Sequence, residues 1–237
     1  MPRQARLDVP GALHHIIVRG INKAPIFKDD QDKTRFLERL GENVLLGKCT
    51  VHAWVLMTNH IHLLFKSGKD GISTVMRKQL TWYAQYFNRR HSRTGHLFEN
   101  RYKSILCDEE TYLLALIRYL HLNPIRAKII ETMEELDRYP WTGHRAIIGK
   151  TDYHWMDINA CLAEFGGTRK KAISEYRRFV REGIEEGHKP SVDRRRINQK
   201  SGWLVPSHGH AKTGPEGRIR RENTGGRGIC HRDIQRG

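Results

Sequence analysis

The sequence lacks the features of membrane-inserted and secreted proteins. No stretch of its 237 residues approaches the roughly 18 uninterrupted apolar residues that a membrane-spanning helix needs. Its first 15 residues, MPRQARLDVPGALHH, also lack the apolar run of a secretory signal. We therefore expect a cytoplasmic protein with no membrane partner.

The chain is also poor in cysteine. Its four cysteines, Cys49, Cys107, Cys161 and Cys230, are far apart and form no C-x-x-C pair. The sequence therefore predicts neither a disulfide framework nor a cysteine zinc site. We expect the four thiols to be reduced and to serve in packing.

Positive charge, by contrast, is in excess. The chain carries 42 lysines and arginines against 26 aspartates and glutamates, a formal net charge of +16. A soluble protein with this charge attracts polyanions, and nucleic acid is the first candidate because binding releases the counterions of its phosphates. We therefore expect the protein to associate with the nucleoid.

The excess charge is divided between two parts of the chain. Residues 189–237 hold 12 basic and 4 acidic side chains, a net charge of +8, together with 8 glycines and few apolar residues. Such a segment cannot build a hydrophobic core, so we predict a basic, disordered tail. The remaining residues carry the other +8 and must contain the fold.

The apolar pattern of the body predicts an α+β fold. The expected strands are residues 12–18, 49–57, 60–65 and 98–107, and the expected helices are residues 28–47, 72–90 and 108–123. This order is that of a ferredoxin-like βαββαβ sandwich with one added helix. We assign residues 1–130 to this domain and residues 131–188 to a small helical extension.

Two histidines share one face of the third predicted strand. Side chains alternate along a strand, so His60 and His62 project together while Ile61 and Leu63 project to the other face. Two imidazoles on one face are a suitable ligand pair for a divalent metal. Strand histidines also often serve only in packing, and the pair alone does not decide between these roles.

The last helix of the domain carries a tyrosine and an asparagine on one face. Tyr119 and Asn123 are four residues apart, so the phenol and the amide can approach the same point. Without further context, the preferred interpretation is that Tyr119 is a half-buried core residue and Asn123 a helix-end residue before Pro124. Tyr112 lies seven residues earlier on the same helix and is the competing candidate for a nucleophile.

Considered together, these motifs resemble those of the HUH single-tyrosine transposases, in particular the REP-associated tyrosine transposases. The resembling stretches cover most of residues 10–130 in order and spacing. They are residues 12–22, 53–64, 86–91, 95–104 and 112–127. The resemblance implies the ferredoxin-like fold with a catalytic helix after it, and an enzyme that cleaves and rejoins single-stranded DNA beside hairpins through a 5′-phosphotyrosine intermediate.

The resemblance also implies a role for each motif residue. Tyr119 maps onto the nucleophile, and His60 and His62 map onto the ligands of Mg²⁺ or Mn²⁺. Asn123 occupies the place of a third metal ligand. Such a metal is chemically useful because a phenol, with a pKa near 10, is a poor nucleophile at neutral pH. The partner would be single-stranded or hairpin DNA, and related enzymes also make a homodimer possible.

Basic side chains and aromatic rings alternate around the second helix and the loop after it, as single-strand recognition requires. The same residues could equally form a solvated helix end over the core. The candidate DNA-binding residues, including those that follow the first strand, are Arg19, Asn22, Arg77, Lys78, Arg89, Arg90, Arg101 and Lys103.

Two other functions fit a small basic ferredoxin-like domain. One is a nucleic-acid-binding module without catalysis, although the strands carry no aromatic signature of an RNA-recognition domain. The other is a ribonuclease that uses histidines for general acid–base catalysis, needs no metal and requires the 2′-hydroxyl of RNA. Covalent attachment to DNA in the presence of a metal would separate the transposase from both.

Overall fold

The computed structural model of the protein describes residues 8–186. The expected tail, 189–237, and the end of the expected extension, 187–188, lie outside the described residues. The strands are β1 (Leu13–Arg19), β2 (Thr50–Leu56), β3 (His60–Lys66) and β4 (Lys103–Cys107). The helices are η1 (Ile21–Lys23), α1 (Asp30–Leu46), α2 (Gly71–Arg90), α3 (Glu109–His121), α4 (Asn123–Arg126), α5 (Met133–Arg138), α6 (His144–Ile147), α7 (Asn159–Ala163) and α8 (Arg169–Glu185).

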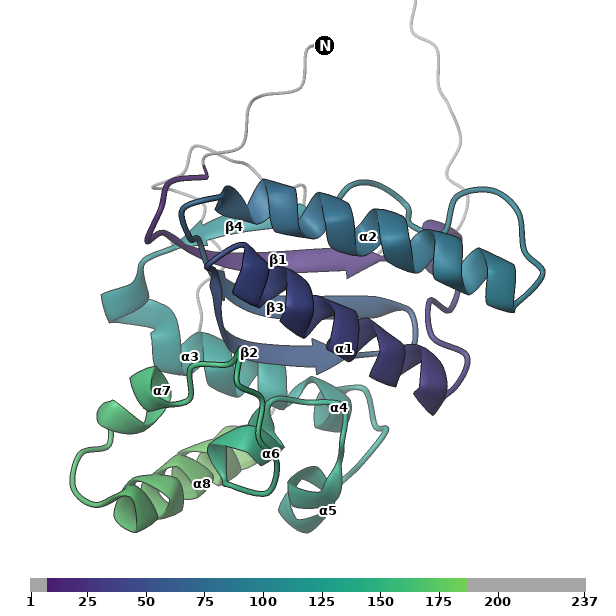
Figure 1. The fold of residues 1–237 in the computed structure, drawn as a ribbon. Helices are drawn as coiled ribbons and strands as arrows, with labels where there is room; N and C mark the ends of the chain where they lie inside the picture. The colour runs from purple at the N-terminus through teal and green to yellow at the C-terminus, as the bar shows by residue number, and fades with distance from the viewer. Residues whose placement is uncertain (1–7, 187–237) are drawn as a thin grey trace, which may run out of the picture. The chain divides into compact units, whose positions relative to one another are not determined.

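The four strands form one antiparallel sheet in the order β2-β3-β1-β4 (Figure 1). The central strands β1 and β3 are paired so that Arg19 lies opposite His60 and Ile17 lies opposite His62. On the other side of β1, Lys103 of β4 lies opposite Ile17. The ferredoxin-like α+β architecture with an added helix is therefore confirmed.

Helices α1 and α2 lie side by side over one face of the sheet (Figure 1). Helix α1 begins where the Asp29 side chain accepts a hydrogen bond from the backbone N–H of Asp32, which satisfies one of the unpaired donors of the first turn. Between the helices, the buried amide of Asn43 donates to the Gln79 side chain over 2.9 Å. This contact fixes how α1 and α2 pack above the sheet.

Helix α3 lies on the opposite side of the sheet from α1 and α2 (Figure 1). Its start is capped by Asp108, which accepts from the backbone N–H and the hydroxyl of Thr111. The helix ends at His121, and the Asn123-Pro124 step opens α4 with proline in its first turn, where the missing N–H costs nothing. The sequence had placed the end of this helix within two residues of where it lies.

The segment after α5 runs along the free edge of β2. The backbone N–H of Leu56 donates to the carbonyl of Trp141, and the N–H of Asp157 donates to the carbonyl of Val51. An edge strand exposes unpaired backbone groups, and this segment pairs several of them. The extension thus packs directly on the ferredoxin-like unit, and all described residues lie in one compact unit.

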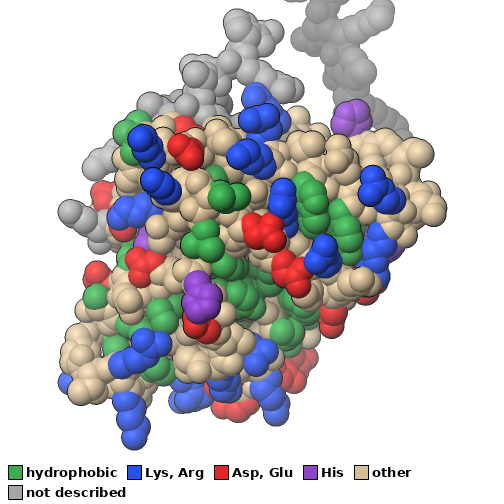
Figure 2. Space-filling view, viewed as in Figure 1, with side chains coloured by type: hydrophobic (Ala, Val, Ile, Leu, Met, Phe, Trp, Pro, Cys, Tyr) green, Lys and Arg blue, Asp and Glu red, His purple; other side chains and the backbone are tan. Residues whose placement is uncertain are grey.

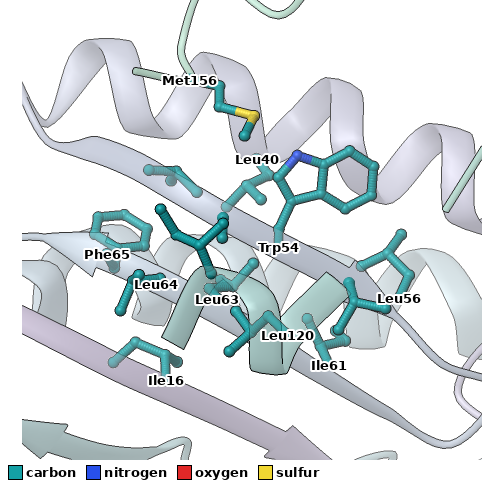
Figure 3. Close-up of a cluster of buried hydrophobic side chains, with 14 of the residues drawn as sticks. Ile16, Leu40, Trp54, Leu56, Ile61, Leu63, Leu64, Phe65, Leu120 and Met156 are labelled. Carbon is teal, nitrogen blue, oxygen red and sulfur yellow. The ribbon is translucent and has the colours of Figure 1, made fainter. Parts of the chain in front are cut away.

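The hydrophobic core joins the sheet to its helices. Figure 3 shows buried side chains from the strands, α1, α3 and the segment before α7 in one cluster, among them Ile16, Leu40, Leu120 and Met156. Trp54 of β2 is fully buried within it. In the described part of the chain, no helix has the length and apolar character that crossing a membrane requires.

Candidate functional site

The sheet face toward α3 carries both predicted histidines. His60 and His62 are on the same side of β3, with ring centroids 5.0 Å apart and ring planes perpendicular. Hydrogen-bonded pairing with β1 sets Arg19 opposite His60. The alternation read from the sequence therefore brings the two imidazoles together in space.

Asn59 controls the protonation of His60. Its side-chain oxygen lies 2.7 Å from Nδ1 of His60. Because an amide oxygen only accepts, Nδ1 of His60 carries the proton and Nε2 carries the lone pair. Burial, and after it the positive charge of Arg19, lowers the pKa of His60 below its usual value. This shift favours the neutral ring, the form in which imidazole binds metals.

A third histidine, which the sequence reasoning missed, completes this cluster. Nε2 of His15 on β1 lies 2.9 Å from Nδ1 of His62, and both side chains are 7% exposed. Leu64 is directly opposite His15, so His15 and His62 are diagonal neighbours across the strands. The adjacent pair His14-His15 was a signal that one histidine would face each side of the sheet, but only the register shows which one meets His62.

Tyr119 approaches the same cluster from α3. Its ring centroid lies 6.1 Å from that of His15 and 6.3 Å from that of His62, both in edge-on arrangements. The guanidinium of Arg126 lies 4.9 Å from the Tyr119 ring centre and also donates to the Tyr119 carbonyl. Tyr112, the competing tyrosine, makes no ring contact with these histidines among the described residues. The structure thus brings Tyr119 beside His15 and His62.

Asn123 follows Tyr119 by one helical turn. Its side-chain nitrogen donates to the backbone carbonyls of Tyr119 and Leu120, over 3.0 and 3.2 Å. Both partners are acceptors, so the amide nitrogen is oriented toward the helix and the amide oxygen is the atom that a metal could use. Asn123 also closes the end of α3, the role that its position before Pro124 suggested.

The two histidine nitrogens fit a divalent metal only if oxygen ligands complete its coordination. Within residues 8–186, no group of three or more His, Cys, Asp or Glu side chains could hold a metal ion. His60 and His62 would therefore provide two nitrogen ligands, and the remaining positions would be filled by an amide, water or substrate phosphate oxygens. Binding through few protein ligands plus substrate phosphates is common for Mg²⁺.

A comparison with protein families matches the part of the chain that carries these residues. Residues 9–123 match the family described as IS200-like transposases. They form an IS200-like transposase domain. The matched segment begins before β1 and ends at Asn123, so it contains His15, His60, His62 and Tyr119.

Two further comparisons, with curated proteins and with solved structures, do not extend this family match. No curated protein matched the chain. A solved structure of a REP-associated tyrosine transposase bound to a REP hairpin is similar over 66% of this chain and 98% of that chain, with 14% sequence identity and a TM-score of 0.49.

The predicted DNA-binding residues of the transposase domain are distributed over both sides of the sheet. Arg19 and Lys103 lie in strand positions that share the site face, since Arg19 is opposite His60 and Lys103 is opposite Ile17 beside His62. Asn22, in η1, and Arg101, just before β4, are exposed in the segments that adjoin these strands.

The four candidates on α2 belong to the other layer. Arg77, Lys78 and Arg89 are exposed on this helix, and Figure 2 shows that the basic side chains on the α1–α2 side are scattered among acidic and apolar ones. Arg90 is engaged within the fold, because it pairs with the carboxylates of Asp29 and Asp32 at the start of α1. The structure therefore gathers only part of the expected set around the histidines.

A buried polar network joins the helix that carries Tyr119 to the helical extension. The Tyr176 hydroxyl on α8 lies 2.7 Å from Nδ1 of His121 and 2.9 Å from Nδ1 of His144. Nε2 of His144 lies 2.8 Å from a carboxylate oxygen of Asp137, whose other oxygen pairs with Arg177. The helical extension thereby supports the end of α3, two residues after Tyr119.

Proposed function

We propose that the protein cleaves and rejoins single-stranded DNA beside hairpins, with Tyr119 as the nucleophile and a divalent metal at His60 and His62. The observation that carries this proposal is the edge-on approach of the Tyr119 ring to the histidine cluster, at 6.1 and 6.3 Å. The family match supports a transposase role for the domain.

In the proposed reaction the Tyr119 hydroxyl attacks the phosphorus of a phosphodiester. A bond forms between its oxygen and phosphorus, the bond from phosphorus to the 3′ oxygen breaks, and the tyrosine loses a proton while the 3′ oxygen gains one. The products are a 5′-phosphotyrosine and a free 3′-hydroxyl. Another 3′-hydroxyl can reverse the step, so strand joining needs no ATP.

The residues around Tyr119 have distinct tasks in this reaction. His60 and His62 would hold Mg²⁺ or Mn²⁺, with the amide oxygen of Asn123 as a third ligand. When bound, such a cation polarises the phosphate and stabilises the charge that develops on its oxygens. Arg19, opposite His60 on β1, would hold the phosphate backbone. Helix α3 would hold the Tyr119 ring beside this point.

A covalent adduct assay tests the proposal. The full chain is incubated with a labelled hairpin oligonucleotide that has a single-stranded flank, with Mn²⁺ or with EDTA, and analysed on a denaturing gel. We expect a protein–DNA adduct with Mn²⁺ that Tyr119→Phe abolishes and that Tyr112→Phe, the matched control on the same helix, retains. An adduct formed by Tyr119→Phe would disprove the assignment.

The same assay separates the two alternative functions. A binding module retains the oligonucleotide without any covalent product. A histidine ribonuclease cleaves an RNA version of the oligonucleotide in EDTA and leaves the DNA intact. Replacing His60 and His62 together by alanine should abolish the adduct while most DNA binding persists, because the cations that contact phosphates remain.

A further inference from the structure

The histidine that the motifs did not include, His15, is joined to one of the two proposed metal ligands. Its Nε2 lies 2.9 Å from Nδ1 of His62, and both side chains are buried on one face of the paired strands β1 and β3. A hydrogen bond between two imidazole nitrogens needs one protonated and one unprotonated nitrogen. Which ring donates therefore decides where the lone pair of His62 lies.

Only one of the two arrangements lets His62 bind a metal. If His15 donates, Nδ1 of His62 accepts, and the neutral ring carries its proton on Nε2. If His62 donates from Nδ1, its lone pair is on Nε2, the nitrogen that does not contact His15. Metal-bound histidines commonly donate their other N–H to a neighbouring acceptor, which fixes both the tautomer and the orientation of the ring.

The other histidine of the pair follows the same pattern. Nδ1 of His60 lies 2.7 Å from the side-chain oxygen of Asn59, which can only accept. His60 is thus held with its lone pair on Nε2. If His15 accepts a hydrogen bond from His62, the rings of His60 and His62 are equivalent. Each would donate from Nδ1 to a protein acceptor, and each would have its Nε2 lone pair available for the same metal.

We propose that His15 is a positioning residue that accepts a hydrogen bond from Nδ1 of His62 and so holds His62 in the tautomer that binds the metal. This inference rests on the proposed metal site at His60 and His62. It adds a residue of β1 to a metal site otherwise built from β3 and Asn123 of α4. His15 itself acts through His62.

A different role for His15 has to be separated from this one. Its ring lies 6.1 Å from that of Tyr119, so it could instead take the tyrosine proton during cleavage. A proton acceptor for Tyr119 affects the reaction but leaves metal binding in the resting protein unchanged. A partner of His62 affects metal binding even without DNA. Metal affinity measured without DNA therefore distinguishes the two roles.

The test measures Mn²⁺ binding to the full chain by electron paramagnetic resonance. His15→Phe keeps a ring but has no acceptor, and it should weaken Mn²⁺ binding by about 10- to 100-fold, the usual effect of losing such a partner. His15→Gln places an amide oxygen near the position of Nε2, and it should stay within a few-fold of the unaltered chain. His14→Gln is the matched control, since His14 contacts Ser104 instead, and it should leave binding unchanged.

A second measurement keeps the proposal testable if His15→Phe does not fold. Histidine ¹⁵N chemical shifts of the unaltered, metal-free protein report which nitrogen of His62 is protonated. We expect the Nδ1-protonated form. A His62 ring protonated on Nε2 would overturn the proposal.

Failure of the inference can be told apart from failure of the proposed function. If the unaltered chain binds no Mn²⁺ at its histidines, the metal site and the role of His15 both fall. If it binds Mn²⁺ and folded His15→Phe binds equally well, the role of His15 alone falls. Loss of adduct with unchanged Mn²⁺ affinity would assign His15 to proton transfer from Tyr119.

Discussion

The buried hydroxyl of Tyr176 allows a quantitative test of how the extension supports helix α3. Nε2 of His144 faces the Asp137 carboxylate, so it carries the proton and Nδ1 of His144 must accept. The Tyr176 hydroxyl therefore donates to His144 and accepts from Nδ1 of His121. Nε2 of His121 is buried without a hydrogen-bond partner among the described residues.

Tyr176→Phe removes the partner of two buried imidazole nitrogens while retaining the ring. Each unsatisfied buried polar group costs about 1–3 kcal/mol, so the loss of two partners should lower the free energy of unfolding by about 2–6 kcal/mol. The loss should be at the lower end of this range if water enters the space that the hydroxyl leaves. Urea unfolding followed by circular dichroism measures the change.

Two other tyrosines provide graded controls. The Tyr83 hydroxyl donates one buried hydrogen bond, 2.7 Å long, to the carbonyl of Ile26, so Tyr83→Phe should cost about 1 kcal/mol. The Tyr86 hydroxyl is buried with no hydrogen-bond partner among the described residues, so Tyr86→Phe should be neutral or stabilising. Equal losses in all three variants would refute the reasoning, because the cost would then not follow the number of partners.

Three further predictions concern the pH dependence of stability, the arginines predicted to contact DNA, and whether one chain or two chains supply the site residues. Burial lowers the pKa of His144, and burial followed by the charge of His144 lowers the pKa of His121. The unfolded chain therefore binds more protons than the folded chain below about pH 6.5, so the free energy of unfolding should fall as the pH drops through that value. A free energy of unfolding that stays constant between about pH 7 and 5 would contradict the assignment. Arg19→Ala should weaken binding to any DNA flank and reduce the slope of log K against log salt concentration by about one, as measured by fluorescence anisotropy. Arg90→Ala should instead lower the melting temperature in thermal melts. Because the histidines and the tyrosine meet within one chain, mixing the tyrosine variant with the double-histidine variant should give no adduct; adduct formation would mean that a dimer exchanges its helices.

Sequence periodicity and strand alternation were sufficient to predict the sheet and its helices. The pattern in residues 60–65 placed His60 and His62 on one face, and the structure has them with ring centroids 5.0 Å apart. The spacing of Tyr119 and Asn123 predicted both on one side of the last helix; in the structure α3 ends at His121 and Asn123 begins α4, but its side chain still bonds to the Tyr119 carbonyl. These features are local, because they depend on residues that are two or four positions apart in the chain.

Features that depend on long-range register could not be read from the sequence. The contact between His15 and His62 joins residues 47 positions apart, and it exists because β1 and β3 pair in one particular register. The network of His121 and Tyr176 links α3 to α8 across 55 positions. Nor could charge alone reveal that Arg90 pairs with the first turn of α1, since an arginine near aromatics is typical of DNA-binding surfaces as well.

The most direct test of the account identifies the residue that becomes attached to DNA. The adduct formed with Mn²⁺ and the hairpin oligonucleotide is digested with protease and nuclease, and the modified peptide is sequenced by mass spectrometry. The account predicts a nucleotide linked through its 5′ phosphate to Tyr119. Attachment to Tyr112 or to any other side chain, or cleavage of the DNA with no attached peptide, would contradict it.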